Sequence, residues 1–350
     1  MSYTTIPTST DYFNTKLWSG NSSTQAITGI GFAPDMVWGK QRTGTESHQL
    51  LDAIRGANNI LVPNTVATAL ADSQILNSFD SDGYTLGSQN QLNDTGYNYV
   101  GWNWKAGTTG SGTTTGSGTG TAYSYSVSTT SGFSIVKYVG NGTAGHTIPH
   151  HLGAVPKMII IKSTTAGEDW IIPPLNDPTK YIVLNSSGLG GNGVGPFNNT
   201  AATSSVFSVG TWGTTNGNSQ TLMAYCFADV QGFSKFGSYT GLGATTGAFV
   251  YTGFKPAFVM TKIATTGGSD TGGWVMVDNK RYPNNLSNSP VIFANLNNAE
   301  SDSYNAEFFS NGFRFNANSV TVNGAGNTYI YMAFAEEPLV STNEIPATAR

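Results

Sequence analysis

The hydrophobic positions of this chain fall in short runs that are rich in β-branched and aromatic residues, such as MIIIK at 158–162 and AFVMTK at 257–262. Apolar runs of this kind, bounded by turn signals, are typical of β-strands. The turn signals are Asn-Gly and Asp-Gly pairs, which tolerate the positive φ angles of two-residue hairpins. These pairs stand at 82–83, 141–142, 216–217, 311–312 and 323–324. Only the stretch 47–62 hints at a helical turn, and Gly56 interrupts it. The pattern predicts an all-β fold with little helix.

One apolar phrase occurs three times: GFAPDMVWGK at 31–40, LGAVPKMIIIK at 152–162 and GFKPAFVMTK at 253–262. In each copy a proline precedes a lysine by six residues; the pairs are Pro34 and Lys40, Pro156 and Lys162, and Pro256 and Lys262. Further landmarks recur upstream in one order, namely Phe13, Trp18 and Gly20; Phe133, Tyr138 and Gly140; and Phe233, Tyr239 and Gly241. Each copy closes on an aromatic-rich strand, NYVGWNWKAG, TLMAYCFADV or TYIYMAFAEE.

These landmarks predict three tandem copies of one β module, at 11–105, 132–230 and 231–340. The period is longer than the 20–50 residues of solenoid repeats. A unit of this size can bury a core of its own. Short strands between frequent turns favour a β-sandwich of the jelly-roll or lectin-like kind. We expect the lysine that ends each phrase to be a strand-end charge that reaches solvent.

Three segments lie outside the predicted modules. Residues 106–131 begin with AGTTGSGTTTGSGTGTA, which has the composition of a flexible linker. If this run is ordered, its amides and carbonyls need partners, and we expect those partners in neighbouring chains. Residues 1–10, MSYTTIPTST, form an N-terminal arm that is too polar to pack alone, so we expect it to dock on a neighbouring subunit. Residues 341–350 form a C-terminal tail.

The composition excludes several classes of partner. Charged residues make up only 10% of the chain and the net charge is −4, whereas an ordinary globular domain has about 25% charged residues. No basic run is present that would neutralise a nucleic-acid backbone. No apolar stretch approaches the roughly 20 residues of a membrane span. Cys226 is the one cysteine, so no intrachain disulfide forms, and nothing reads as a signal peptide. We therefore expect synthesis in a reducing cytoplasm.

Motifs that would indicate an enzyme are missing. The sequence contains no GxSxG, HExxH, P-loop or paired CxxC motif, and the glycine-rich GNGTAG at 140–145 does not open a predicted helix. His146, His150 and His151 cluster, but no carboxylate or cysteine stands beside them to complete a metal site. We expect no catalytic residue, no cofactor and no metal.

Four residues are candidates for contact with a glycan or another surface partner. Trp170 and Trp274 follow the polar loops STTAGEDW and ATTGGSDTGGW, so either ring could lie exposed and stack on a sugar. Asp278 and Arg281 repeat the spacing of Asp52 and Arg55, and the second copy has IIPPLNDP instead. A recurring Asp/Arg pair at a turn is most simply a structural ion pair, and a sugar-binding carboxylate is the alternative.

Long segments of the chain resemble a family of tail-fibre-like virion proteins from marine tailed phages, particularly phages of cyanobacteria. The resemblance lies in DYFNTKLWSGNSSTQAITGIGFAPDMVWGKQR, in SFDSDGYTLGSQNQLNDTGYNYVGWNWKAG and in the ending YMAFAEEPLVSTNEIPATAR. It covers nearly the whole chain in three copies. The second copy departs most, with Leu152-Gly153 where the others have Gly-Phe and with no Asp/Arg pair.

The resemblance implies a non-enzymatic structural protein of the virion, a tail fibre or appendage that contacts the host cell surface. It implies a homotrimer, with other virion proteins and a host glycan or protein as partners and with the N-terminal arm docked on a subunit or on the virion. Two other functions stay open: a capsid or tail decoration protein without receptor contact, and a polysaccharide depolymerase. A lectin of cellular origin is a further option. No catalytic residue is carried over from the family.

Overall fold

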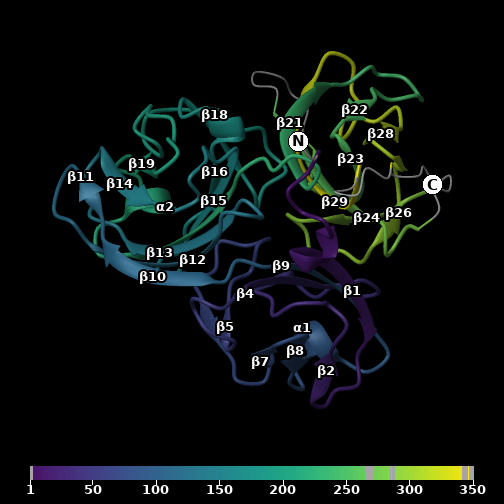
Figure 1. Ribbon diagram of the computed structural model, residues 1–350, viewed down its shortest axis with the longest axis horizontal. Coiled ribbons are helices and arrows are strands. Elements are labelled where there is room, and N and C mark those ends of the chain that lie inside the picture. Colours follow the sequence, from purple (N-terminus) through teal and green to yellow (C-terminus); the bar gives the residue numbers. More distant parts are fainter. Residues whose placement is uncertain (1–2, 265–271, 284, 286–287, 341–345, 347–350) are drawn as a thin grey trace.

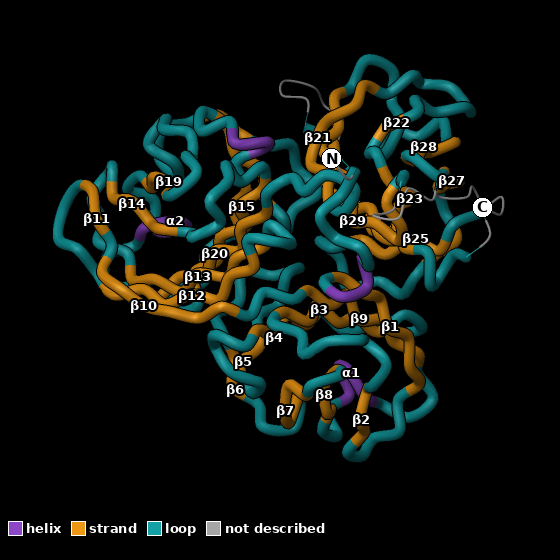
Figure 2. The backbone as a smooth tube through the Cα atoms, in the orientation of Figure 1, coloured by secondary structure: helices purple, strands orange, loops and turns teal. Residues whose placement is uncertain are grey.

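The computed structural model describes residues 3–264, 272–283, 285, 288–340 and 346, and antiparallel β-sheets make up most of it. Figure 2 shows strands in every part of the body and only short helical segments. Those segments are η1 (Ser9–Asp11), α1 (Asn90–Asn93), η2 (Pro174–Asn176) and α2 (Gly213–Asn216). No helix in this described part is long and apolar enough to cross a membrane. The predicted all-β class is confirmed, and the stretch 47–62 contains two strands and a turn instead of a helix.

One strand order recurs three times. Numbered by their order along the chain, the four strands of each set lie side by side in the order first, fourth, second, third. The sets are β1 (Phe13–Ser19), β9 (Asn98–Trp104), β3 (Met36–Gln41) and β4 (Gln49–Asp52); β13 (Phe133–Val139), β20 (Thr221–Phe227), β15 (Met158–Ser163) and β16 (Ile171–Ile172); and β21 (Ser234–Thr240), β29 (Thr328–Pro338), β23 (Phe254–Ile263) and β24 (Val275–Asp278). We refer to residues 11–105, 106–230 and 231–340 as lobes 1, 2 and 3. Figure 1 shows the lobes around a common centre, with lobe 1 at the bottom, lobe 2 at the left and lobe 3 at the upper right.

A smaller sheet accompanies the large sheet in each lobe, and an apolar core lies between the two. The small sheets are β2 (Gln25–Ile27), β8 (Gly83–Leu86) and β7 (Leu76–Asp80); β11 (Thr115–Gly116), β14 (His146–Pro149) and β19 (Val206–Val209); and β22 (Val250–Tyr251), β28 (Gly312–Asn316) and β27 (Asn305–Phe309). Further strands are the pair β5 (Asn59–Ile60) and β6 (Leu70–Ala71), and the extensions β17 (Lys180–Val183), β18 (Gly191–Asn192), β25 (Pro290–Phe293) and β26 (Ser301–Asp302).

The run predicted as a flexible linker is part of the sheet of lobe 2. Strand β10 (Thr108–Thr113) pairs along its whole length with β12 (Ala122–Ser128), and β12 pairs with β13. Gly110 and Gly112 lie opposite Tyr125 and Tyr123, and a Cβ at either glycine would meet the tyrosine ring. The glycines therefore make room for two rings that lie flat on the ladder. The backbone partners that we expected in neighbouring chains are in the same chain.

The N-terminal arm also docks within the chain. The Tyr3 hydroxyl donates to the Gly253 carbonyl at 2.7 Å, and Thr4 is buried. Ile6 is 1% exposed and belongs to the core that all three lobes share. One isoleucine and one tyrosine thus anchor an otherwise polar segment on lobe 3, and the expected dock on a neighbouring subunit is not needed to order it. The predicted C-terminal tail lies outside the described residues, except for Pro346.

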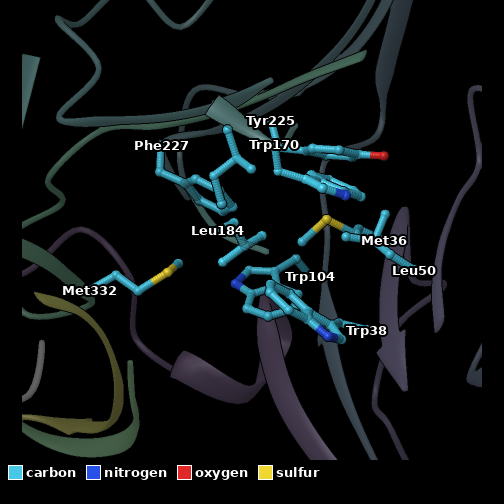
Figure 3. A pocket seen from close by; sticks show the side chains of 10 residues that line it. Met36, Trp38, Leu50, Trp104, Trp170, Leu184, Tyr225, Phe227 and Met332 are labelled. Carbon is cyan, nitrogen blue, oxygen red and sulfur yellow. The ribbon is translucent and has the colours of Figure 1, made fainter. Parts of the chain in front are cut away.

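The inner faces of the three large sheets meet in one central core. Trp104, Phe227 and Phe334 stand at equivalent positions of β9, β20 and β29 and contact one another. The ring centroids are 6.4 Å apart for Trp104 and Phe227, 5.6 Å for Trp104 and Phe334, and 6.0 Å for Phe227 and Phe334. Figure 3 shows part of this centre, where side chains from all three lobes point toward one another. The sequence predicted modules that each bury a core of their own. In the structure, each lobe buries only the outer face of its large sheet, against its own small sheet. Burial of the inner face needs the other two lobes.

The three repeated lysines are fully buried, so the expected solvent-exposed charge is wrong, and two of them bond to a neighbouring lobe. Alternation along each strand puts the lysine on the same face as the residues that enter the central core. The Lys162 ammonium donates to the Val66 carbonyl of lobe 1 at 2.9 Å, and that of Lys262 donates to the Ser187 carbonyl of lobe 2 at 2.8 Å. Lys40 donates to carbonyls of its own lobe. Burial lowers the pKa of all three lysines to about 8.

A buried asparagine recurs at one place in every lobe: it is the last residue of α1, the last residue of α2, and a residue of the equivalent turn of lobe 3. The Asn216 side chain accepts from the Asn141 amide at 2.9 Å and donates to the Gly210 and Thr143 carbonyls at 2.7 Å and 3.0 Å. Asn93 makes the same three bonds with Asn21, Gly87 and Ser23, and Asn323 makes them with Leu242, Ala317 and Ala244. In each case the asparagine reaches the carbonyl six residues before it. These amides join the first strand of each lobe to the segment before the last strand.

The repeated aromatic and glycine landmarks serve the same junction. Trp18, Tyr138 and Tyr239 each donate to the carbonyl of the residue that precedes the buried asparagine, at 2.9 Å, 2.6 Å and 2.7 Å. A Cβ at Gly20, and at its counterparts in the other lobes, would collide with the backbone just after that asparagine. The spacing of aromatic and glycine therefore follows from a close approach of two backbone segments.

Replacing Asn216 by alanine tests the junction. The change leaves the Asn141 amide and the Gly210 carbonyl without partners and removes one of the two bonds to the Thr143 carbonyl, so we expect the free energy of unfolding to fall by about 2–3 kcal/mol. Chemical denaturation measures it. The neighbouring Asn218→Ala substitution is the control, because Asn218 is exposed and its loss should cost less than about 0.5 kcal/mol. Equal losses in the two variants would contradict the proposed role of the amide.

His48 gives the fold a pH dependence. Its Nδ1 accepts from the Trp38 indole at 2.9 Å, and its Nε2 lies 3.0 Å from the Phe293 carbonyl of lobe 3, to which it donates. Burial lowers the pKa of His48 from 6.5 to about 3. The unfolded chain therefore takes up the proton first as the pH falls, and this stability is present above pH 6.5 and is lost toward pH 3.

Between pH 7 and pH 5 we expect His48 to account for a loss of about 2 kcal/mol in the free energy of unfolding. The His48→Gln variant has no titrating group here and should lose correspondingly less over that interval. Burial also lowers the pKa of His150, to about 4, so His150→Gln is a matched variant in which the His48 contribution persists. A His48→Gln curve parallel to the wild-type curve would show that His48 does not titrate as described.

Candidate functional site

The two tryptophans predicted as sugar-stacking candidates are buried between lobes. Trp170 and Trp274 are both 0% exposed. The Trp170 indole of lobe 2 donates to the Val62 carbonyl of lobe 1 at 3.2 Å, and the Trp274 indole of lobe 3 donates to the Val183 carbonyl of lobe 2 at 3.0 Å. His48 makes the corresponding contact from lobe 1 to lobe 3. A ligand from solvent cannot stack on either tryptophan, and the three contacts close the lobes into a ring.

The Asp/Arg pairs are buried ion pairs in the same ring. Arg281 Nε lies 2.6 Å from Asp278 Oδ2 with both side chains fully buried, and Arg55 and Asp52 repeat this geometry in lobe 1. Each carboxylate also accepts from the next lobe: Asp52 from the Tyr225 hydroxyl at 2.8 Å, and Asp278 from the Trp102 indole at 3.1 Å. Asp278 and Arg281 thus have their hydrogen-bond partners inside the protein. They fit the role of a structural ion pair and not that of a sugar-binding pair.

The second copy lacks an Asp/Arg pair because the neighbouring lobe offers it no donor. The strand registers align Trp102, Tyr225 and Met332 at one position of β9, β20 and β29, two residues before the central aromatic rings. Met332 is the partner position for lobe 2, and its thioether cannot donate a hydrogen bond. Prolines 173 and 174 replace the acid there. The acid is present in the two lobes that face a donor and absent from the lobe that does not.

The histidines of lobe 2 are also engaged in the structure. His146 and His150 are buried and bonded to main-chain carbonyls, with His146 Nδ1 3.2 Å from Ser117 O and His150 Nε2 3.1 Å from Thr203 O. His151 stacks on Tyr125 with ring centroids 3.8 Å apart. Within the part of the chain that the structure describes, no group of three or more potential metal ligands gathers.

Trp212 is the exposed tryptophan of the molecule. Its exposed fraction is 38%, whereas the other six tryptophans are at most 8% exposed. It lies at the N-terminal end of α2, where the indole rests against the backbone of Gly195, since a Cβ there would overlap the ring nitrogen. Tyr181 on β17 packs against it edge to face, with ring centroids 5.2 Å apart. These two contacts hold the ring while part of its surface stays exposed.

Polar groups suited to hydroxyl recognition lie next to Trp212. A Cβ at Gly213 would collide with the Glu168 carboxylate, and the Gln220 amide nitrogen lies close to the same position. Gln220 is held by the Ser163 hydroxyl, which donates to its side-chain oxygen at 2.9 Å. An aromatic face beside a carboxylate and an amide can contact the C–H face of a sugar and bind its hydroxyls. We call Trp212, Tyr181, Glu168 and Gln220 the Trp212 platform.

The sequence did not predict this platform, because the tryptophans that it singled out, Trp170 and Trp274, were those that follow long polar loops. The residue at the N-terminal end of α1 in lobe 1 is Gln89, so Trp212 has no aromatic counterpart there. The sequence does contain one signal for this site. Trp212 is a large aromatic residue without a counterpart in the repeat, so the shared core does not require it.

The comparisons with known proteins give one family. No curated protein and no solved structure matches the chain. A family model described as a domain of unknown function (DUF7483) matches residues 8–338, which span all three lobes. This chain therefore belongs to the DUF7483 family.

Proposed function

We propose that the protein is a non-enzymatic structural protein of a phage virion, part of a tail fibre or similar appendage, and that it contacts the host cell surface. The resemblance of its repeated segments to tail-fibre-like virion proteins supports the location. Folding would take place in the host cytoplasm before assembly. The Trp212 platform is the observation that supports surface contact, because it is an exposed aromatic face with polar neighbours in a chain whose other tryptophans are buried.

We further propose that the three lobes are tandem β-sandwich modules of the jelly-roll or lectin-like kind, copied from one ancestral unit. The recurring strand order, the buried asparagines and the buried lysines support this origin. A body closed around one core, with few charges on its surface, suits a particle exposed to changing salt, since little of its stability depends on screened surface ion pairs.

Assembly into a homotrimer with other virion proteins as neighbours stays a prediction. The closed core already buries, within one chain, the inner faces that three separate modules would otherwise have to share. A trimer of this protein would therefore use outer surfaces, and light scattering of the purified chain measures its mass directly.

Two alternatives have different consequences. A capsid or tail decoration protein would be incorporated into particles without binding host cells. A polysaccharide depolymerase would release reducing ends from host envelope polysaccharide and would need accessible carboxylates. Asp52 and Asp278 are both committed to an arginine and to a donor of the next lobe, so neither suits hydrolysis, and a depolymerase would have to use another carboxylate such as Glu168 of the Trp212 platform.

Replacing Trp212 by alanine tests the proposed contact. We expect at least a tenfold loss in binding of the fluorescently labelled protein to host cells, equivalent to about 1.4 kcal/mol. Tyr97→Ala is the matched control, because Tyr97 is an aromatic residue of lobe 1 with 37% exposure, and it should bind as the wild type does. Thermal unfolding checks that both variants keep the wild-type stability. Wild-type protein that neither binds host cells nor competes with particles would favour the decoration protein.

A further inference from the structure

A hollow of about 490 Å³ opens mainly on lobe 3, and it shares no lining residue with the Trp212 platform. The N-terminal arm, the turn between β20 and β21, and strand β22 enclose it. Its lining residues are Tyr3, Asp229, Gln231, Gly232, Ser234, Lys235, Tyr251, Thr252 and Gly253. Its size falls within the roughly 300–1,000 Å³ range of small-molecule sites.

The lining contains no leucine, isoleucine, valine, methionine or phenylalanine. The two tyrosines supply ring faces, and the other side chains offer hydroxyl, amide, ammonium and carboxylate groups. An apolar ligand would find tyrosine rings here but no branched aliphatic side chain, and polar groups surround those rings. A ligand that combines C–H faces with many hydroxyl groups would match both kinds of lining group.

The two charges in the hollow neutralise each other. Lys235 Nζ lies 3.1 Å from Asp229 Oδ2, and Asp229 Oδ1 accepts from the Phe236 amide at 2.8 Å. Neither charge is therefore free to attract an ion of opposite sign. Lys235 retains ammonium protons and Asp229 retains lone pairs for a neutral ligand. The charge balance thus favours an uncharged ligand over an acidic or a basic one.

The tyrosines are placed for contact. Tyr251 is 55% exposed, and Tyr3 is held across the hollow by its bond to the Gly253 carbonyl. A Cβ at Gly253, which has a φ of +81°, would approach the Tyr3 hydroxyl to 2.7 Å. Burial raises the pKa of the Tyr3 hydroxyl well above its usual range, and the neighbouring Tyr251 adds to the rise. Tyr3 therefore stays protonated, while Ile6 in the central core fixes the arm that carries it.

We propose that this hollow binds a neutral carbohydrate, with the Tyr251 ring against one sugar face and the side chains of Gln231, Asp229 and Lys235 on its hydroxyls. The site lies mainly on lobe 3, with Asp229 from the end of lobe 2, and it shares no residue with the Trp212 platform. The N-terminal arm forms one wall, so binding of sugar and docking of the arm should support each other.

Saturation-transfer NMR and titration with the full-length protein test the proposal. The probes are methyl glucoside, methyl galactoside and N-acetylglucosamine as neutral sugars, with glucuronate and glucosamine as charged counterparts. We expect at least one neutral sugar to bind and its charged counterparts to bind several-fold more weakly. Tyr251→Ala should weaken binding at least tenfold, and Tyr251→Phe, which keeps the ring, should weaken it less.

Two controls separate this site from other surfaces. Phe249→Ala removes an aromatic residue of similar exposure (50%) that does not line the hollow, and it should leave sugar binding unchanged. Trp212→Ala should also leave the Tyr251-dependent binding unchanged, so failure of the proposed host contact and failure of this site are distinguishable. The proposal is overturned if none of the three neutral sugars binds, if Tyr251→Ala binds like the wild type, or if charged sugars bind more tightly than neutral ones.

Discussion

The contact among Trp104, Phe227 and Phe334 is the constraint on which the rest of this structure depends. Each large sheet has two apolar faces, and the small sheet of its own lobe covers only one of them. The other face is left for burial by neighbouring lobes, and three equivalent rings meet where the three faces converge. A single lobe would expose this face to water, so we infer that the chain folds as one closed body and not as three independent beads.

The repeated residues divide into two groups once this closure is recognised. The buried asparagines and their glycine neighbours act within a lobe and are unchanged in all three, whereas the aromatic neighbour is Trp18 in lobe 1 and a tyrosine in the other two. The lysine is present in every copy, but only Lys162 and Lys262 bond to a neighbouring lobe. The Trp or His contacts and the Asp/Arg pairs connect neighbouring lobes and differ from copy to copy. Those differences are matched on the two sides of a contact: an acid stands opposite Tyr225 and Trp102, and no acid stands opposite Met332. The lobes are therefore not interchangeable.

This division explains where functional residues are found. Aromatic residues such as Trp170 and Trp274 are buried in the cores, so they are not accessible to a partner. Exposed aromatic residues occur at positions such as Trp212 and Tyr251, which the closed core does not require. The candidate contact surfaces of lobes 2 and 3 are thus departures from the repeat on a body that the repeat stabilises.

The sequence by itself determined the strand-rich class, because apolar runs and Asn-Gly turns are local signals, and it determined the recurrence of one phrase, because spacing survives duplication. It also identified Trp18 and Gly20 as landmarks without showing their role. Only the tertiary structure decided that Lys162, Trp170 and Asp278 are buried, that residues 108–113 form a strand, and that Trp212 is exposed. Each of these depends on which segments become neighbours, and some of those segments are more than 100 residues apart in the sequence. Periodicity along one strand shows that a face will be buried, but it does not show whether the same lobe, another lobe or another molecule will bury it.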